Sequence, residues 1–326
     1  MKVIILGGAG FIGSHLTDFL LKKKYKIIVI DNLSTGRINN IKHIKKKIKF
    51  IKADISKIGT WESAFKNSTY VFHLAALADI VPSIDNPEKY FHSNVTGTLN
   101  VLQACRKFKI KKLLYAASSS CYGIPKNYPT KETEKINPKF PYAVTKYLGE
   151  QLIIYWSIIF KVNFISLRLF NVYGPKSRTS GTYGAMFGTF LAQKLAKKPF
   201  TLVGDGNQSR DFTYVSDVAK AFELAAKSKL FNKIYNVGSG KIVKINKIIS
   251  YLGGEHIKIP KRPGEPDITH ADISVIKKEL KWKPEVDIKD GIKIILKNIT
   301  YWKKAPVWSP KSIKRATKNW FKYLKK

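Results

Sequence analysis

A chain of 326 residues with 44% hydrophobic and 25% charged residues has the composition of a folded globular protein and is long enough for two lobes. Its net charge of +37 raises nucleic-acid binding as a hypothesis. However, only seven of the 59 basic residues are Arg, the lysines are scattered along the chain, and no nucleic-acid-binding motif occurs. We therefore expect no nucleic-acid partner. No apolar run reaches the roughly 18 residues of a membrane span, no signal peptide is expected, and Cys105 and Cys121 lie in apolar contexts, which favours free thiols in the cytoplasm.

The N-terminal residues combine a strand, a glycine turn and a helix. Residues 3–6 form a short apolar run, typical of a strand that is buried on both faces. Gly7, Gly10 and Gly13 follow and lead into a helical pattern. This turn lets backbone N–H groups approach a pyrophosphate at the helix N-terminus, so the strand–turn–helix context predicts a dinucleotide site where the glycines alone would be a weak signal.

A second apolar strand over residues 26–30 ends on Asp31, 18 residues after Gly13. A carboxylate at this position can bind a ribose hydroxyl, and its charge would repel a 2′-phosphate. The sequence therefore predicts NAD as cofactor and not NADP. A turn aspartate without a binding role is the alternative.

Later strand-like runs alternate with helical patterns, which predicts a parallel, doubly wound Rossmann sheet of the α/β class. The strands are expected at 48–53, 70–74, 112–117 and 162–167, and the main helices at 87–108 and 142–160. We expect an NAD-binding domain over 1–168 with about 212–240 rejoining it, a smaller discontinuous substrate lobe over 169–211 and 241–300, and a helical tail over 301–326. The tail contains Trp302, Trp308 and Trp320, and Ser309-Pro310 predicts a helix start.

Tyr142 and Lys146 lie four residues apart at the start of a helical pattern, so they share one helix face. A cation there favours the phenolate, so we expect the Tyr142 pKa to fall from its usual value of about 10 and Tyr142 to serve as a general base. The spacing also arises by chance in a chain with 16 Tyr. Its other instance, Tyr122 and Lys126, encloses a glycine and a proline that prevent a helix.

The glycine turn, Asp31, Ser118, Tyr142 and Lys146 occur in an order that resembles the extended short-chain dehydrogenase/reductase family. Later segments resemble its NAD-dependent nucleotide-sugar epimerase/dehydratase branch, and together the resemblance covers about residues 1–300. These segments are 118–123, 168–175, 204–212, 236–239, 262–265 and 271–274.

The resemblance implies a catalytic set of Ser118, Tyr142 and Lys146, because the catalytic Ser or Thr of relatives lies four residues before a Tyr-Gly pair. It implies cofactor contacts, beyond Tyr142 and Lys146, from Gly7, Gly10, Phe11, Ile12, Gly13, Asp31, Asn32, Ser34, Gly36, Asp54, Ile55, Leu74, Ala75, Ala76 and Asn94. It implies substrate contacts from Ser118, Ser119, Ser120, Tyr142, Asn171, Arg178, Val203, Arg210, Phe212, Arg262, Glu265 and Thr269. No metal is expected.

Three of the seven arginines, Arg168, Arg210 and Arg262, fall inside these segments, and a fourth, Arg178, follows one of them by three residues. Arginine binds a diphosphate with two parallel hydrogen bonds, which lysine cannot do. By family position, Arg210 and Arg262 should hold the pyrophosphate and Glu265 the uridine ribose. Arg168, near a strand end, is expected to be structural, and the role of Arg178 stays open.

The resemblance implies epimerisation at C4 of a UDP-sugar through a transient 4-keto intermediate. Tyr142 would take the proton of the 4-hydroxyl, Ser118 would bond the same oxygen, and Lys146 would lower the tyrosine pKa and hold the nicotinamide ribose. Relatives that dehydrate or decarboxylate carry acids just after the catalytic Ser or Thr, where this chain has Ser119 and Ser120. This favours an epimerase over a 4,6-dehydratase or a UDP-glucuronate decarboxylase; a non-catalytic NAD-binding scaffold is a remote alternative.

Two further expectations concern the sugar and the assembly. Thr269, three residues before Asp272, stands where relatives gate the space beside the C2 substituent, so its small size predicts that an N-acetyl group is tolerated. UDP-glucose or galactose, UDP-N-acetylhexosamine and UDP-glucuronate all stay open as substrates. Helices 87–108 and 142–160 are apolar over more than one face, and relatives pair them between subunits, so we expect a homodimer.

Overall fold

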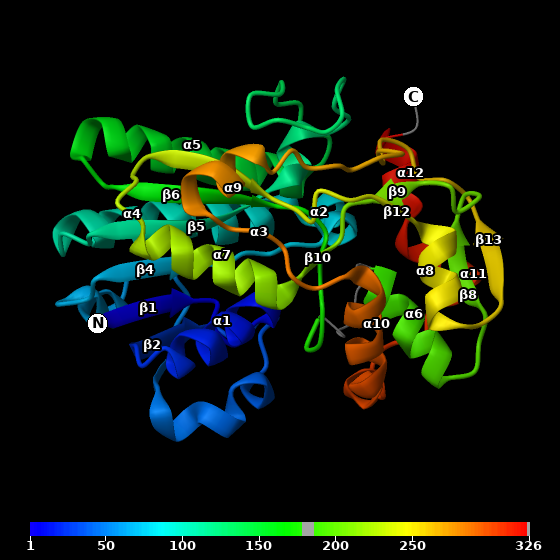
Figure 1. Cartoon of the computed structure of the whole chain (residues 1–326), viewed down its shortest axis with the longest axis horizontal. Helices are drawn as coiled ribbons and strands as arrows, with labels where there is room; N and C mark the ends of the chain where they lie inside the picture. Colours follow the sequence, from blue (N-terminus) through cyan, green and yellow to red (C-terminus); the bar gives the residue numbers. More distant parts are fainter. Residues whose placement is uncertain (178–185, 325–326) are drawn as a thin grey trace.

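The computed structural model describes residues 1–177 and 186–324, and the predicted site residue Arg178 lies outside them. A seven-stranded sheet dominates the left half of Figure 1, with strand order β11-β6-β5-β4-β1-β2-β3. Every neighbouring pair is parallel, which confirms the predicted fold class. The strands are β1 (Lys2–Leu6), β2 (Lys26–Asp31), β3 (Lys49–Lys52), β4 (Tyr70–His73), β5 (Lys112–Ser118), β6 (Phe164–Leu169) and β11 (Lys233–Val237).

Both faces of this sheet are covered, which explains why its strands read as continuous apolar runs. Val3 and Ile5 of β1 belong to a core with α1 (Phe11–Lys22) and α7 (Val215–Lys227). Ile4 and Leu6 point the other way, into a core with α4 (Gly97–Lys107) and α5 (Pro141–Phe160). Successive side chains of a strand alternate between the faces, so one short strand contributes to both cores.

The strand order reverses beside β1, whose neighbours are β2 and β4. In parallel sheets of this kind ligands bind beyond the carboxyl ends of the strands at such a reversal. The glycine turn follows β1, and residues Leu74–Ala76 follow β4, so both lie at this edge.

The expected helix over 87–108 is divided in the structure. It consists of α3 (Pro87–Phe91), a π-helical turn (His92–Thr96) and α4. Short elements complete this half of the molecule: α2 (Ile80–Asp85), α9 (Ser274–Leu280) and 3-10 turns at Ile38–Asn40, Lys42–Lys47, Thr60–Phe65 and Ser119–Tyr122.

A smaller lobe occupies the right half of Figure 1. It contains three two-stranded sheets and the helices α6 (Met186–Leu195), α8 (Ile245–Leu252) and α10 (Ile288–Lys297). Helix α8 buries positions 245, 248, 249 and 252, the spacing of one apolar helix face. The strand pairs are β7 (Val172–Tyr173) with β10 (Thr213–Tyr214), β9 (Ser209–Arg210) with β12 (Val243–Lys244), and β8 (Phe200–Val203) with β13 (His256–Ile259).

The C-terminal tail forms a 3-10 turn (Ile299–Trp302) and two short helices, α11 (Pro310–Ala316) and α12 (Lys318–Leu324). Ser309 caps α11 by accepting a hydrogen bond from the Ser312 N–H, and Pro310 takes the first helical position, as the sequence predicts. Trp302 and Trp320 are both buried.

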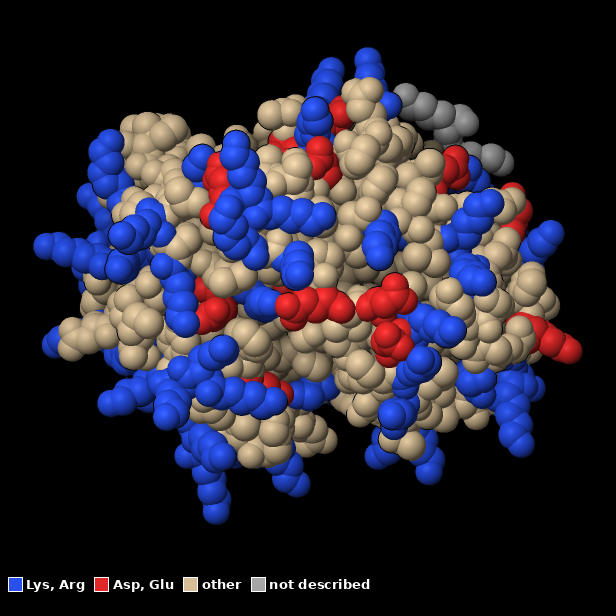
Figure 2. Space-filling model, viewed as in Figure 1, with Lys and Arg blue, Asp and Glu red and all other residues tan. Residues whose placement is uncertain are grey.

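Lys and Arg side chains spread over the whole face seen in Figure 2, with acidic groups near its centre. Both cysteines are free and buried, as expected. Within residues 1–177 and 186–324, no helix combines the length and the apolar composition that crossing a bilayer requires.

Candidate active site

The glycine turn brings three backbone segments closer together than side chains would allow. Gly7 has a positive φ of 78°, and a Cβ there would come within 2.7 Å of the Ala75 nitrogen. A Cβ at Gly13 would overlap the Gly7 carbonyl oxygen. Gly10 precedes α1, and no side chain caps that helix. The turn therefore presents backbone and a helix N-terminus, a combination that suits a diphosphate.

Asp31 ends β2 and is fixed against the glycine turn. Its Oδ2 accepts a hydrogen bond from the Ala9 N–H at 2.9 Å, and its Oδ1 accepts one from the Leu33 N–H at 2.8 Å. Gly36 passes so close that a Cβ on it would lie 2.8 Å from the carboxylate. Burial raises the pKa of Asp31, and the two backbone hydrogen bonds oppose that rise.

Several other residues that were predicted to contact the cofactor lie at the same strand ends. Asn32 donates to the Asp54 carboxylate at 3.2 Å and accepts from the Ser34 N–H at 2.9 Å. Ile55 is buried against α4, since a Cβ at Gly97 would lie 3.2 Å from its side chain.

Asn94 lies behind the segment that follows β4 and joins it to α5. Its Oδ1 accepts from the Leu77 N–H at 2.8 Å, and its Nδ2 donates to the Leu77 carbonyl and to Thr145 Oγ1, each at 3.0 Å. Both amide hydrogens of Asn94 are thus donated within the protein. Asn94 therefore links the predicted cofactor segment to α5, the helix that carries Tyr142 and Lys146.

Ser118, Tyr142 and Lys146 come from two adjacent elements, β5 and α5. Ser118 is the last residue of β5, and its side chain lies close enough to the Tyr142 hydroxyl to affect the pKa of that group. Ser118 Oγ also accepts from the Ser120 N–H at 3.2 Å and donates to Ser120 Oγ at 3.1 Å. One turn beyond Tyr142, the Lys146 Nζ lies 4.1 Å from the ring centre of Tyr115.

The expectation of a lowered Tyr142 pKa was wrong for this structure. Burial raises the pKa of the Tyr142 hydroxyl, and the nearby Ser118 side chain only partly opposes that rise. Burial likewise lowers the pKa of Lys146 to about 7, and the Glu150 carboxylate opposes that fall. Both shifts favour the neutral form because desolvation penalises the charged form of each group.

Glu150, one turn beyond Lys146, was missed by the sequence reasoning. It accepts hydrogen bonds from Arg168 Nη2 at 2.7 Å and Arg168 Nε at 3.1 Å, and from Ser166 Oγ at 2.6 Å. This buried ion pair fastens α5 to β6 and gives Arg168 the structural role that was expected. An acid four residues after Lys146, on an otherwise apolar helix face, is the signal that could have identified Glu150.

Arg210 and Arg262, predicted to hold a pyrophosphate, meet on one carboxylate. Glu265 pairs with Arg210 Nη2 at 3.3 Å, and with Arg262 Nε at 2.8 Å and Nη2 at 3.1 Å. Arg210 Nη1 also donates to the carbonyl oxygens of Ser209 and Asp267. The structure thus places the two cations and Glu265 in a single cluster.

Asn171 and Thr269 also come together, although 98 residues separate them. Asn171 has a positive φ of 28°, and its Nδ2 donates to Thr269 Oγ1 at 2.7 Å and to the Asp211 carbonyl at 3.1 Å. The Asp211 carboxylate, another group missed from the sequence, accepts hydrogen bonds from Ser239, Gly240 and Ala271. It holds three segments of the smaller lobe together around these two residues.

The remaining predicted substrate residues are largely packed into cores. Val203 lies in an apolar cluster with Phe140 and Trp320. Phe212 packs edge-on against Tyr173 and Phe187.

Known proteins resemble this chain in sequence and fold. The model of the NAD dependent epimerase/dehydratase family matches residues 3–238. The chain belongs to this family. NAD is the cofactor of the family, and the glycine turn with Asp31 beside it is a cradle of the kind NAD requires.

Relatives and solved structures agree over nearly the whole chain. A putative UDP-glucose 4-epimerase from Methanocaldococcus jannaschii is 38% identical over 302 residues, covering 90% of this chain and 97% of the relative. A UDP-N-acetylglucosamine 4-epimerase from Methanobrevibacter ruminantium, solved with UDP-N-acetylmuramic acid, is 33% identical with a TM-score of 0.85, covering 91% of this chain and 98% of that one. A UDP-glucuronic acid 4-epimerase from Bacillus cereus, solved with UDP-glucuronic acid and NAD, is 32% identical with a TM-score of 0.85, covering 92% and 99%.

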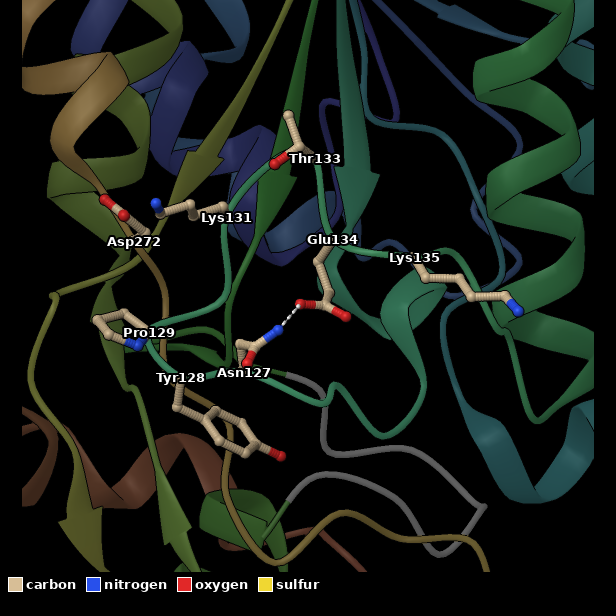
Figure 3. A pocket seen from close by; sticks show the side chains of 8 residues that line it. All are labelled: Asn127, Tyr128, Pro129, Lys131, Thr133, Glu134, Lys135 and Asp272. Carbon is tan, nitrogen blue, oxygen red and sulfur yellow. Dashed lines mark hydrogen bonds between the residues drawn. The ribbon is translucent and has the colours of Figure 1, made fainter.

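Figure 3 shows a pocket of about 440 Å³. Its walls are the loop Asn127–Lys135 and Asp272, joined where the Asp272 N–H donates to the Thr130 carbonyl at 2.9 Å. In Figure 3 the Asn127 amide faces Glu134, the 3.5 Å contact drawn there. No residue predicted for the cofactor or the substrate lines this pocket.

Proposed function

We propose that this chain is an NAD-dependent UDP-sugar 4-epimerase. The observation that carries the proposal is the contact between Ser118 and Tyr142, with Lys146 one turn further along the same helix. A hydroxyl pair can bind one sugar oxygen from two sides and move its proton. The Arg210–Glu265–Arg262 cluster, in the smaller lobe, supplies the charge that a nucleotide diphosphate needs.

Bound in the glycine cradle, NAD would supply a reversible hydride acceptor, so that C4 is oxidised and then reduced on its opposite face with no net redox change. As the tyrosinate, Tyr142 takes the proton of the sugar 4-hydroxyl, and Ser118 orients that oxygen by hydrogen bonding. Lys146 favours the tyrosinate only in its ammonium form, because opposite charges lower the tyrosine pKa. Glu150 supports that form, since its carboxylate raises the Lys146 pKa.

An epimerase fits this chain better than a dehydratase or a decarboxylase. Elimination of water or loss of CO₂ needs a second acid or base near C5. The residues that follow Ser118 are Ser119 and Ser120, whose hydroxyls do not titrate near neutral pH. NMR of the products from NAD-loaded enzyme with UDP-glucose, UDP-N-acetylglucosamine and UDP-glucuronate should show inversion at C4 alone. Release of water or CO₂ would contradict the proposal.

We further propose that the sugar site beside Thr269 admits a bulky C2 group such as N-acetyl. Thr269 is small, and its hydroxyl is held by Asn171 Nδ2 at 2.7 Å and by the Asp211 N–H at 3.2 Å. Thr269→Tyr should abolish turnover of UDP-N-acetylglucosamine and retain that of UDP-glucose. Thr269→Val is the control, because it removes these hydrogen bonds at nearly constant volume. Equal losses on both sugars in the tyrosine variant would show that Thr269 is no gate.

The outer face of α5 supports a homodimer. Four large apolar side chains on this face are exposed at helical spacing: Val144, Leu148, Tyr155 and Ile159. A second copy that covers this face would remove it from water. Light scattering at micromolar concentration should report a dimer, and Ile159→Lys should give monomers. Ile58→Lys, at an exposed isoleucine outside α5, should leave the dimer intact.

A further inference from the structure

Trp320 joins the C-terminal tail to the segment that carries Arg262. It is 2% exposed, and its Nε1 donates a hydrogen bond to the Pro263 carbonyl at 2.8 Å. The guanidinium carbon of Arg262 lies 5.2 Å from the centre of the indole ring, within the range of a cation–π contact. One side chain therefore holds both the backbone of this segment and its charged group.

The same indole packs against the start of the catalytic helix. The rings of Trp320 and Phe140 are 5.0 Å apart and cross at 65°, an edge-on contact. Phe140 is the N-cap of α5, two residues before Tyr142, and a Cβ on Gly264 would lie 3.7 Å from its ring. The tail, the Arg262 segment and the first turn of α5 thus meet at one point.

Other contacts anchor the tail to both halves of the molecule. Asn319 Nδ2 donates to Asp85 Oδ1 of α2 at 2.8 Å, on the side of the large sheet. Gln193 Nε2 of α6 donates to the Trp308 carbonyl at 2.7 Å, on the side of the smaller lobe. Ile313 completes an apolar cluster with Val81 of α2.

We infer that the tail is a positioning element for the diphosphate site and that Trp320 is the residue through which it acts. Stacking on the indole and pairing with Glu265 restrict the rotamers of Arg262 before any ligand arrives. Binding then loses less side-chain entropy, and the diphosphate is held at a fixed distance from Tyr142. This inference rests on the proposed binding of a UDP-sugar.

Titration calorimetry of the NAD-loaded full chain with UDP tests the inference. Trp320→Ala should weaken UDP binding about tenfold, equivalent to about 1.4 kcal/mol. Trp320→Phe keeps an aromatic ring and loses the bond to Pro263, so a loss of about threefold is expected. Trp302→Ala is the matched control: Trp302 is equally buried in the same tail but packs in the core of the smaller lobe. It should lower the unfolding temperature and leave UDP affinity unchanged.

A double-mutant cycle separates positioning from general loosening. If Trp320 acts through Arg262, Trp320→Ala should have no further effect on UDP affinity in an Arg262→Ala background. Additive losses would overturn the inference, and so would wild-type affinity in Trp320→Ala. Should that variant fail to fold, wild-type affinity in Trp320→Phe overturns it equally. Absence of UDP binding by the wild-type chain would instead refute the proposed function on which the inference rests.

Discussion

Replacement of Glu150 by glutamine tests how the catalytic helix is held. The Glu150 and Arg168 side chains are only 2% and 5% exposed, and three hydrogen bonds between 2.7 and 3.3 Å join them. Glu150→Gln keeps the shape and removes the negative charge, which leaves the guanidinium buried without a counter-ion. Breaking a buried pair from one side costs about 3–5 kcal/mol. We expect the lower end, about 3 kcal/mol, because a glutamine oxygen still accepts a hydrogen bond.

Urea unfolding followed by tryptophan fluorescence measures this loss in free energy. Glu285→Gln, which removes the acid from the exposed pair with Lys220, is the control and should leave the free energy of unfolding nearly unchanged. Replacing Glu150 and Arg168 together by methionine should recover most of the loss, since no charge then stays buried. A Glu150→Gln loss no larger than that of the control would refute the reasoning.

The same variant bears on catalysis through Lys146. Glu150 raises the Lys146 pKa, so removal of its charge lowers that pKa further. If turnover needs the ammonium form, the fall of kcat at alkaline pH should move to lower pH in Glu150→Gln. An unmoved pH–rate profile would show that Glu150 has only a structural role.

Three further outcomes are expected. Tyr142→Phe should reduce kcat at least about 100-fold while NAD binding persists, because only the proton acceptor is lost; activity within tenfold of wild type would reject Tyr142 as the base. Ser118→Ala should lower kcat by about 10²–10⁴ and Ser119→Ala much less, and the reverse order would identify the wrong serine. Burial lowers the Lys146 pKa to about 7 from the usual 10.5. Between these two pH values the unfolded chain holds a proton on Lys146 that the folded chain does not, so the free energy of unfolding increases as the pH rises. The free energy of unfolding of wild type relative to Lys146→Met should therefore rise from pH 7 to pH 10.5 and stay level below pH 7; a constant difference would contradict the shift.

The local features of this chain could be predicted from the sequence because each depends only on residues that are neighbours along the chain. The glycine turn needs only a strand before it and a helix after it, and Asp31 follows its strand directly. Tyr142 and Lys146 share a face because a helix repeats every 3.6 residues. Alternating apolar runs were sufficient for the parallel sheet, because both of its faces are covered and most strand positions are therefore apolar.

Tertiary structure decided what depends on burial and on distant partners. The Tyr142 pKa shift has the opposite sign to the prediction because burial outweighs the opposing Ser118 side chain. Burial also lowers the pKa of the neighbouring Lys146 to about 7. Glu265 pairs with Arg210, which lies 55 residues earlier in the chain. Trp320 bonds to the Arg262 segment from a tail that has no motif of its own. Such contacts join segments that are close only because of the chain topology. They therefore cannot be predicted from the periodicity of side chains along the sequence.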